Sequence, residues 1–181
     1  MSTLFVNNLN TASGTTITVP TGKKIIGTDA GSIAGTGNVV NVTHAQYGSG
    51  NSVSPSTSFV DTATLGTVTT THANSKILVI SDLPIQTQDK DCIWTMGLRS
   101  SIDSYASNLF QKHFVNYATN NHLMNFTGMS FLHTANQVAG TAITYKYYVK
   151  GSNTATGSGW YCVDAWGQSG FNFSILFLEI K

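Results

Sequence analysis

The side chains that could do chemistry are few and widely separated in this chain. Eight Asp or Glu, nine Lys or Arg and five His residues are spread over 181 positions. The nucleophile motif of α/β-hydrolases, Gly-x-Ser-x-Gly, does not occur. The nearest string, Gly167-Gln168-Ser169-Gly170, is typical of a turn. No two carboxylates are spaced in a way that nominates a glycosidase pair. The sequence therefore predicts no catalytic residue and a protein that is not an enzyme.

Candidate metal ligands are equally sparse. His113, His122 and His133 are nine and eleven residues apart, which matches neither a helix face nor a zinc knuckle. The Asp89-Lys90-Asp91 run is typical of a solvated loop tip rather than of a calcium site. One alternative stays open. If three copies of the chain assembled around a threefold axis, one histidine near that axis would be presented three times and could form a metal site. Otherwise we expect no metal and no cofactor.

Aromatic residues near the C-terminus are the remaining candidates for binding. Trp160 and Trp166 follow a loop rich in Gly, Ser, Asn and Thr, and Tyr148 lies on the strand before it. Exposed aromatic rings beside amide and hydroxyl groups can stack on sugars. We therefore take Tyr148, Trp160 and Trp166 as candidate contacts for a glycan or receptor. Packing in a core or an interface is the alternative for the two tryptophans.

Composition narrows the class of protein and of partner. Charged residues make up 9% of the chain, against about 25% in typical soluble proteins. The net charge is +1 and no basic patch emerges, so we expect neither nucleic-acid binding nor membrane insertion. The N-terminus lacks the features of a signal peptide, which predicts synthesis in a cytoplasm. Cys92 and Cys162 lie in apolar runs, and free thiols are favoured over a disulfide.

Short apolar runs recur along most of the chain, with polar turns between them. Strands are predicted at 39–47, 59–70, 76–83, 92–99, 110–117, 123–132, 142–149, 160–165 and 171–180. Helical spacing also fits 105–117, although a strand is favoured there. Because no strand–helix alternation occurs, the sequence predicts an all-β protein, an antiparallel jelly-roll-like sandwich.

Two of these strands show clearly which face is apolar. At 92–99, Cys92, Trp94, Met96 and Leu98 oppose Ile93, Thr95, Gly97 and Arg99. At 142–149, the apolar face carries Ile143, Tyr145, Tyr147 and Val149, and Lys146 and Tyr148 lie on the other.

Residues 1–35 are predicted to form a separate β-hairpin arm and linker before the sandwich at 36–181. The segments 15–19 and 23–26 flank the turn sequence Pro20-Thr21-Gly22, and a Gly-rich connector follows. A lone hairpin is only marginally stable in water. The arm should therefore pack on the larger domain, on sister chains or on a receiving protein, and its candidate docking residues are the apolar Ile17, Val19, Ile25 and Ile26.

The final strand, 171–180, is apolar on both faces. Phe171, Phe173, Ile175 and Phe177 alternate with Leu176, Leu178 and Ile180. A strand with two apolar faces needs a cover on each side, and the chain has few helices to supply the second one. We therefore predict that a second copy of the protein supplies it. The candidate subunit-interface residues are Phe171, Phe173, Ile175, Leu176, Phe177, Leu178 and Ile180.

The N-terminal stretch from Val6 to Gly31, with its Thr15-Thr16-Ile17-Thr18-Val19-Pro20-Thr21-Gly22 core, resembles the opening of structural proteins of tailed bacteriophages, marine and cyanobacterial phages above all. Ser75-Lys76-Ile77-Leu78-Val79 and the closing Phe177-Leu178-Glu179-Ile180 look like the terminal domain of the same group. The resemblance implies fibre or virion proteins, commonly trimers. It also implies end domains that are often jelly rolls like those of tumour necrosis factor, whose final strand lines the threefold contact.

Together these features predict a homotrimeric tail fibre, spike or tip of a bacteriophage virion that takes part in host attachment. Its partners would be other virion proteins, of tail or capsid, and a host surface glycan or protein. The alternative is a trimeric capsid-decorating (cement) or head-fibre protein that stabilises the shell.

Overall fold

The computed structural model describes residues 37–47, 51–53, 56–88, 92–116, 122–152, 159–162 and 173–181. The predicted arm at 1–35 lies outside these ranges. The described residues form ten strands and one short 3-10 helix, η1. The strands are β1 (Val39–Tyr47), β2 (Asn51–Val53), β3 (Val60–Thr69), β4 (Lys76–Gln88), β5 (Cys92–Ser100), β6 (Phe110–Asn116), β7 (His122–Thr134), β8 (Ala142–Gly151), β9 (Gly159–Cys162) and β10 (Phe173–Ile180), and η1 spans Ser101–Asp103.

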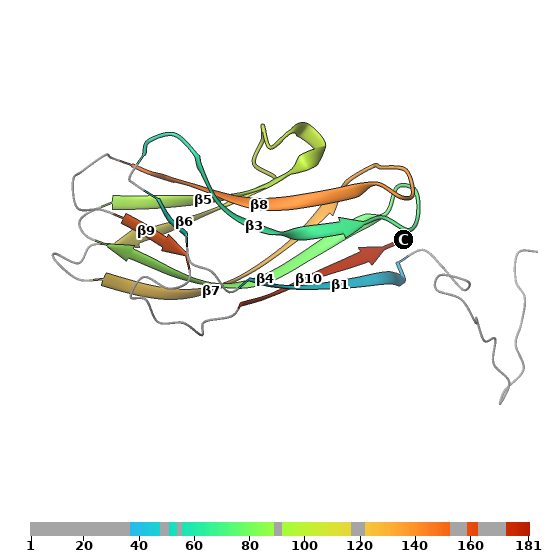
Figure 1. The fold of residues 1–181 in the computed structure, drawn as a ribbon, viewed down its shortest axis with the longest axis horizontal. Helices are drawn as coiled ribbons and strands as arrows, with labels where there is room; N and C mark the ends of the chain where they lie inside the picture. The colour runs from blue at the N-terminus through green and yellow to red at the C-terminus, as the bar shows by residue number, and fades with distance from the viewer. Residues whose placement is uncertain are drawn as a thin grey trace, which may run out of the picture. The chain divides into compact units, whose positions relative to one another are not determined.

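The strands form two antiparallel sheets that pack face to face (Figure 1). Sheet A has the order β1-β10-β4-β9-β2, with β7 on the other edge of β4, and sheet B has the order β3-β8-β5-β6. Without the short strands β2 and β9, the orders are β1-β10-β4-β7 and β3-β8-β5-β6. These are the strand orders of a jelly roll, so the predicted fold class is confirmed.

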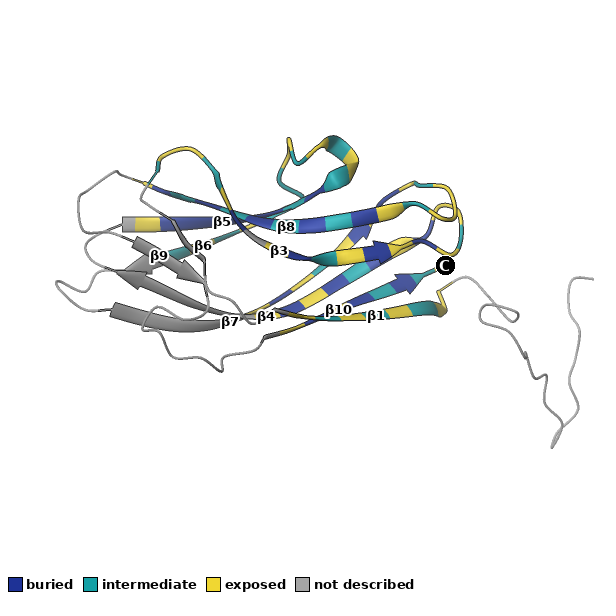
Figure 2. Ribbon diagram, viewed as in Figure 1, coloured by how far each residue is buried: buried dark blue, intermediate teal, exposed yellow. Residues whose placement is uncertain are grey.

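The period-two patterns in the sequence set which side chains enter the core. Trp94, Met96 and Leu98 on β5 are at most 1% exposed, as predicted. Burial alternates along β8, with Ile143, Tyr145, Tyr147 and Val149 inside (Figure 2). Sheet A contributes Ile77, Val79, Ile175 and Phe177. Each such side chain stabilises the fold by about 2 kcal/mol.

Two polar contacts cross the core between the sheets. The Tyr147 hydroxyl and the Ser81 Oγ are 2.5 Å apart, and the Tyr145 hydroxyl is 2.8 Å from His133 Nδ1. Burial lowers the pKa of His133, and the charge of Asp103 only partly opposes this effect. Burial also raises the pKa of Tyr145. Both pairs therefore hold neutral, hydrogen-bonded groups, as buried polar atoms require.

One glycine lets the two sheets approach closely. Gly66 on β3 has a φ of 151°, and a Cβ there would lie 3.0 Å from Ala45 Cβ and 3.1 Å from the Phe177 ring. Only a residue without a side chain fits this position. The register of β3 against β8 also shifts between Thr64 and Gly66, and such irregularities bend a strand.

Most strand predictions match the observed elements. The segment with helical spacing is the strand β6, so the preference for a strand was correct. Strand β4 runs on to Gln88, beyond the predicted end at residue 83. The three-residue strand β2 was not predicted.

Candidate functional site

The outer face of sheet A carries an apolar band that crosses four strands. Strand registers place Val42 opposite Leu178, Leu178 opposite Leu78, and Leu78 opposite Leu132. Opposite residues in an antiparallel pair point to the same face. We call the row formed by these four residues, with its neighbours Val39, Ile80, Leu176 and Ile180 on the same face, the apolar band.

The side chains of the apolar band are substantially exposed to solvent. Val42 is 57%, Leu132 45%, Ile80 37% and Leu176 36% exposed. Of the eight exposed large hydrophobic residues among those described, five lie in the band, because Val39 also belongs to it. Contiguous exposed apolar surface of this kind marks an interaction site.

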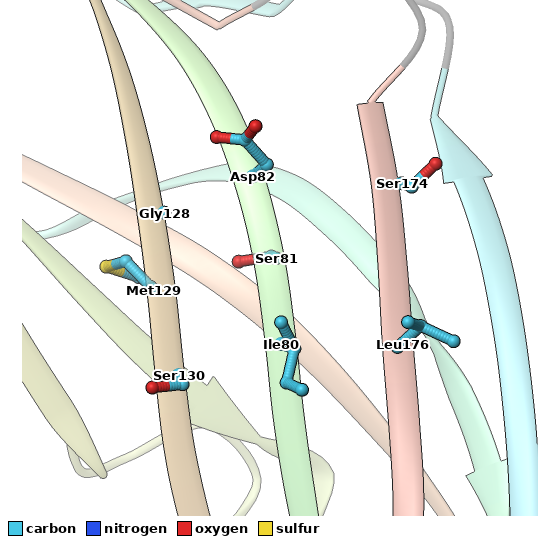
Figure 3. A pocket seen from close by; sticks show the side chains of 8 residues that line it. All are labelled: Ile80, Ser81, Asp82, Gly128, Met129, Ser130, Ser174 and Leu176. Atoms are coloured by element: carbon cyan, nitrogen blue, oxygen red, sulfur yellow. The ribbon is translucent and has the colours of Figure 1, made fainter.

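Two charged side chains bound the apolar band along β4, one at the first residue of the strand and one at its middle. Lys76 and Asp82 point to the same outer face, two residues beyond Leu78 and Ile80 respectively. A hollow of about 660 Å³ opens where the band meets Asp82, and Figure 3 shows Ile80 and Leu176 on neighbouring strands within it. The hollow is lined by Ile80, Ser81, Asp82, Gly128, Met129, Ser130, Ser174 and Leu176.

The two faces of the terminal strand have different roles. Leu176, Leu178 and Ile180 lie on the outer face, where another chain could cover them. Ile175 and Phe177 are fully buried in the core of this chain, so their predicted place in a subunit interface is wrong. They occupy the core because they face Tyr145 and the other inward residues of sheet B, and Phe177 stacks on the Tyr145 ring at 5.5 Å.

A buried carboxylate fixes the end of the terminal strand. Glu179 is 0% exposed and accepts hydrogen bonds from the backbone N–H groups of Thr71 and His72, each at 2.9 Å. The Thr71 hydroxyl donates a third bond at 2.7 Å. Burial alone would raise the pKa of Glu179, but these bonds and one from Ser75 outweigh it and hold the pKa below its usual value. The ionised carboxylate thus ties β10 to the β3–β4 turn.

The outer face of sheet B is different, because cations and aromatic rings alternate on it. The Arg99 guanidinium lies 4.8 Å from the Phe59 ring centroid and 4.4 Å from that of Tyr148. The Lys150 ammonium lies 5.0 Å from the Phe59 ring centroid. Lys146 lies 5.0 Å from the Tyr105 ring. We call Phe59, Arg99, Tyr105, Lys146, Tyr148 and Lys150 the basic face.

Hydrogen bonds hold two cations of the basic face, Arg99 and Lys146, in place. Arg99 donates from Nε to Asn108 Oδ1 at 2.6 Å and from Nη1 to the Tyr105 carbonyl at 2.8 Å. Lys146 pairs with Asp61 at 2.7 Å, and the hydrogen bond to Asp61 raises the pKa of Lys146. These side chains are ordered before any ligand arrives, which reduces the entropic cost of binding.

The candidate glycan contacts fall only partly within the described residues. Tyr148 lies on the basic face, where its half-buried ring contacts Arg99. Trp160 belongs to β9, but its side chain is not among those the structure describes, and Trp166 lies outside the described ranges. The same holds for Phe171, for the Phe173 side chain, and for the proposed docking residues Ile17, Val19, Ile25 and Ile26.

The structure describes the side chains of two of the three candidate metal ligands, His113 and His133, and it does not bring these two together. His113 is exposed on the outer face of sheet B, and His133 is buried between the sheets. Over the described ranges, no three His, Cys, Asp or Glu side chains are grouped as a metal site would require. The described residues also include no helix that is long and apolar enough to cross a membrane. Cys92 and Cys162 lie in β5 and β9, with undescribed side chains.

Sequence reasoning missed five of the eight residues of the apolar band and most of the basic face. Leu78 and Ile80 alternate with Ile77 and Val79, so β4 has two apolar faces, the same signal that identified the terminal strand. Val42 and Leu132 gave no such signal, because polar residues follow or flank them on the same side of the strand, His44 after Val42 and Ser130 and Thr134 around Leu132. The sequence did carry a signal for the basic face, because Lys146, Tyr148 and Lys150 alternate with apolar residues along β8.

Comparisons with known proteins give little further information. No protein-family model and no curated protein match the chain. Structures of infectious bursal disease virus, Gx and Gt strains, align with 87% of this chain at 14% and 13% identity, each with a TM-score of 0.40. A crystal structure of the VP2 subviral particle of that virus aligns with 87% of it at 11% identity and a TM-score of 0.35. The chain spans only 40% to 42% of these proteins. TM-scores below 0.5 carry no argument about the role of this chain.

Proposed function

We propose that this chain is a non-enzymatic virion structural protein of a tailed bacteriophage. It would act as a homotrimeric tail fibre, spike or tip that attaches the particle to the host surface. The observation that carries the proposal is the apolar band, which exposes large side chains across four strands of sheet A. The resemblance of both ends of the sequence to phage structural proteins supplies the biological setting.

Self-association through the apolar band would cover the large apolar side chains that a monomer leaves exposed to water. Full burial of an exposed large apolar side chain is worth about 1.5–3 kcal/mol, and the partly exposed side chains of the row would gain a share of this on association. A homo-oligomer covers the same surface on every copy. Three copies also present three identical attachment sites, and such multivalency strengthens binding even when each site is weak.

The native mass of the purified full chain tests the oligomeric state. We expect about three times the monomer mass of 19.3 kDa, measured by light scattering or native mass spectrometry at micromolar concentration. Leu132→Glu places a charge in the band and should give monomers. Val138→Glu is the matched control, because Val138 is 71% exposed and lies outside the band in the β7–β8 loop. A wild-type monomer, or equal behaviour of the two variants, would contradict the proposal.

A second experiment tests attachment itself. Fluorescently labelled full chain should bind host cells, and the Leu132→Glu variant should bind them more weakly because it has lost multivalency. If the wild-type chain bound empty phage shells and not cells, it would be a decorating protein and the attachment role would be wrong. Release of soluble sugar from the cell surface would contradict the non-enzymatic assignment.

A further inference from the structure

The basic face concentrates positive charge in a protein that has little charge. The four strands of sheet B contain one carboxylate, Asp61, but four Lys or Arg residues. Three of the four cations, Arg99, Lys146 and Lys150, belong to the basic face. The whole chain has a net charge of only +1. This face therefore attracts anions more strongly than the average surface of the protein.

A hollow of about 540 Å³ adjoins the basic face at Lys150. Its lining includes Ile93, Thr95, His113 and Ser152. The Thr95 hydroxyl lies 2.9 Å from His113 Nδ1, and the backbone N–H of Ser152 donates to the Ile93 carbonyl at 2.9 Å. The lining thus joins one cation, several hydroxyl or imidazole groups and one apolar side chain, Ile93, which is 44% exposed. A volume of this size is typical of small-ligand sites.

Lys150 connects the hollow to the ordered cations. It lines the hollow, and its ammonium group also lies against the Phe59 ring that contacts Arg99. Among the described residues no carboxylate pairs with Lys150. Two cations are therefore held against one ring beside a polar hollow, and an anionic group in the hollow would pair with Lys150, the cation that lines it.

These groups fit one class of ligand better than others. A sugar ring has an apolar face for Ile93 and hydroxyl groups for the Thr95 and His113 side chains, and a carboxylate or sulfate on it would pair with Lys150. Nucleic acid would need a longer track of cations than three. We propose that the hollow and the basic face bind an anionic saccharide. This inference rests on the proposed attachment role, since a host surface is where such a ligand would be met.

Titration of the full chain with defined oligosaccharides tests the proposal. The probes are tetragalacturonate, a sulfated tetrasaccharide, neutral maltotetraose and tetraglutamate, with binding measured by calorimetry and by NMR shift changes. We expect at least one of the two acidic saccharides to bind at least tenfold more tightly than maltotetraose and tetraglutamate, and the pair shows whether carboxylate or sulfate is preferred. Equal binding of acidic and neutral sugars, or equal binding of the peptide, would overturn the proposal.

Two variants and one control locate the site. Lys150→Gln should weaken binding of the acidic saccharide at least tenfold, and His113→Ala should weaken it at least threefold. Lys181→Gln removes an equal charge from an exposed residue at the end of the other sheet and should leave affinity unchanged. Equal losses in Lys150→Gln and Lys181→Gln would show diffuse attraction and overturn the proposal. His113→Ala tests the site independently if Lys150→Gln fails to fold.

The outcome can be separated from that of the proposed function. A trimer that binds no acidic saccharide would overturn this inference and leave the assembly intact. A monomer that binds the saccharide through Lys150 would overturn self-association and leave this site standing. The native mass of each variant is therefore measured on the sample used for titration.

Discussion

The side-chain carboxamide of Asn108 occupies the space that a Cβ atom at Gly97 would need. The same carboxamide accepts the hydrogen bond from Arg99 Nε. Gly97 and Arg99 lie two residues apart on the outer face of β5. Because Gly97 has no side chain, Asn108 has room beside it, and Asn108 orients Arg99. The position of the guanidinium between the rings of Phe59 and Tyr148 thus depends on a glycine.

Gly97→Ala should destabilise the protein by about 1–3 kcal/mol, because the new methyl group displaces Asn108. Urea denaturation would measure the change. The matched control is Gly128→Ala, since a Cβ at Gly128 meets no atom within 4 Å. Adding Asn108→Ala to Gly97→Ala should cost less than the sum of the two single changes, because the clash is gone. Equal stability of Gly97→Ala and Gly128→Ala would contradict this account.

Glu179→Gln should cost about 1–3 kcal/mol at neutral pH, because it removes a charged acceptor from buried donors. The pKa of Glu179 in the folded chain lies below its ordinary value of 4.5. The stabilisation is therefore complete above about that pH and is lost as the pH falls through the folded-state pKa. Denaturation from pH 7 to pH 3 should show the wild type and the variant converging in acid. A difference that stays constant over this range would count against the carboxylate.

His133 should make the protein less stable in mild acid. Burial lowers its pKa below the ordinary value of 6.5, so the unfolded chain takes up a proton at a higher pH than the folded chain. Stability is then full above about pH 6.5 and falls as the pH drops from there through the folded-state pKa. His133→Leu should remove this part of the pH dependence, whereas His44→Gln on the exposed face should keep it. The check is the unfolding midpoint between pH 8 and pH 5.

Substitutions on the two faces of β10 should act on different equilibria. Phe177→Ala removes a fully buried ring and should cost about 3–5 kcal/mol in the free energy of unfolding. Leu178→Ala should change the unfolding of the monomer much less, but should raise the concentration at which the oligomer dissociates. Sedimentation equilibrium and urea denaturation of both variants would show this. A large unfolding effect of Leu178→Ala without any change in association would contradict the assignment of the outer face.

The fold could be predicted because single strands carry their own signal. In β8 four large apolar residues, Ile143 to Val149, alternate with polar ones, and only a half-buried strand explains this period. The order of strands had no such local signal. β10 lies between β1 and β4, which are far from it in the sequence, so no spacing within one segment could reveal the neighbours.

The candidate interface was predicted in part for the same reason. Two apolar faces on β10 showed that a second cover was needed, but not which face belonged to the core. That choice depends on register, which places Thr43 and Val79 beside Phe177, and Val42 and Leu78 beside Leu178. The basic face joins Phe59, Arg99 and Lys146 from separate segments, and only the folded sandwich brings them together.

The two ends of the described sandwich meet, because the backbone N–H of Gly37 donates to the Lys181 carbonyl and the Lys181 N–H donates to Asn38. Figure 1 shows the C-terminus beside the start of β1. The order of the strands along the chain is therefore separable from their order in space. A circular permutant that joins Lys181 to Gly37 by a short linker and opens at the turn around Gly140 keeps every strand pairing. The new termini would lie at the turn around Gly140, in the β7–β8 connection, and the sandwich could then be attached to a particle through that turn.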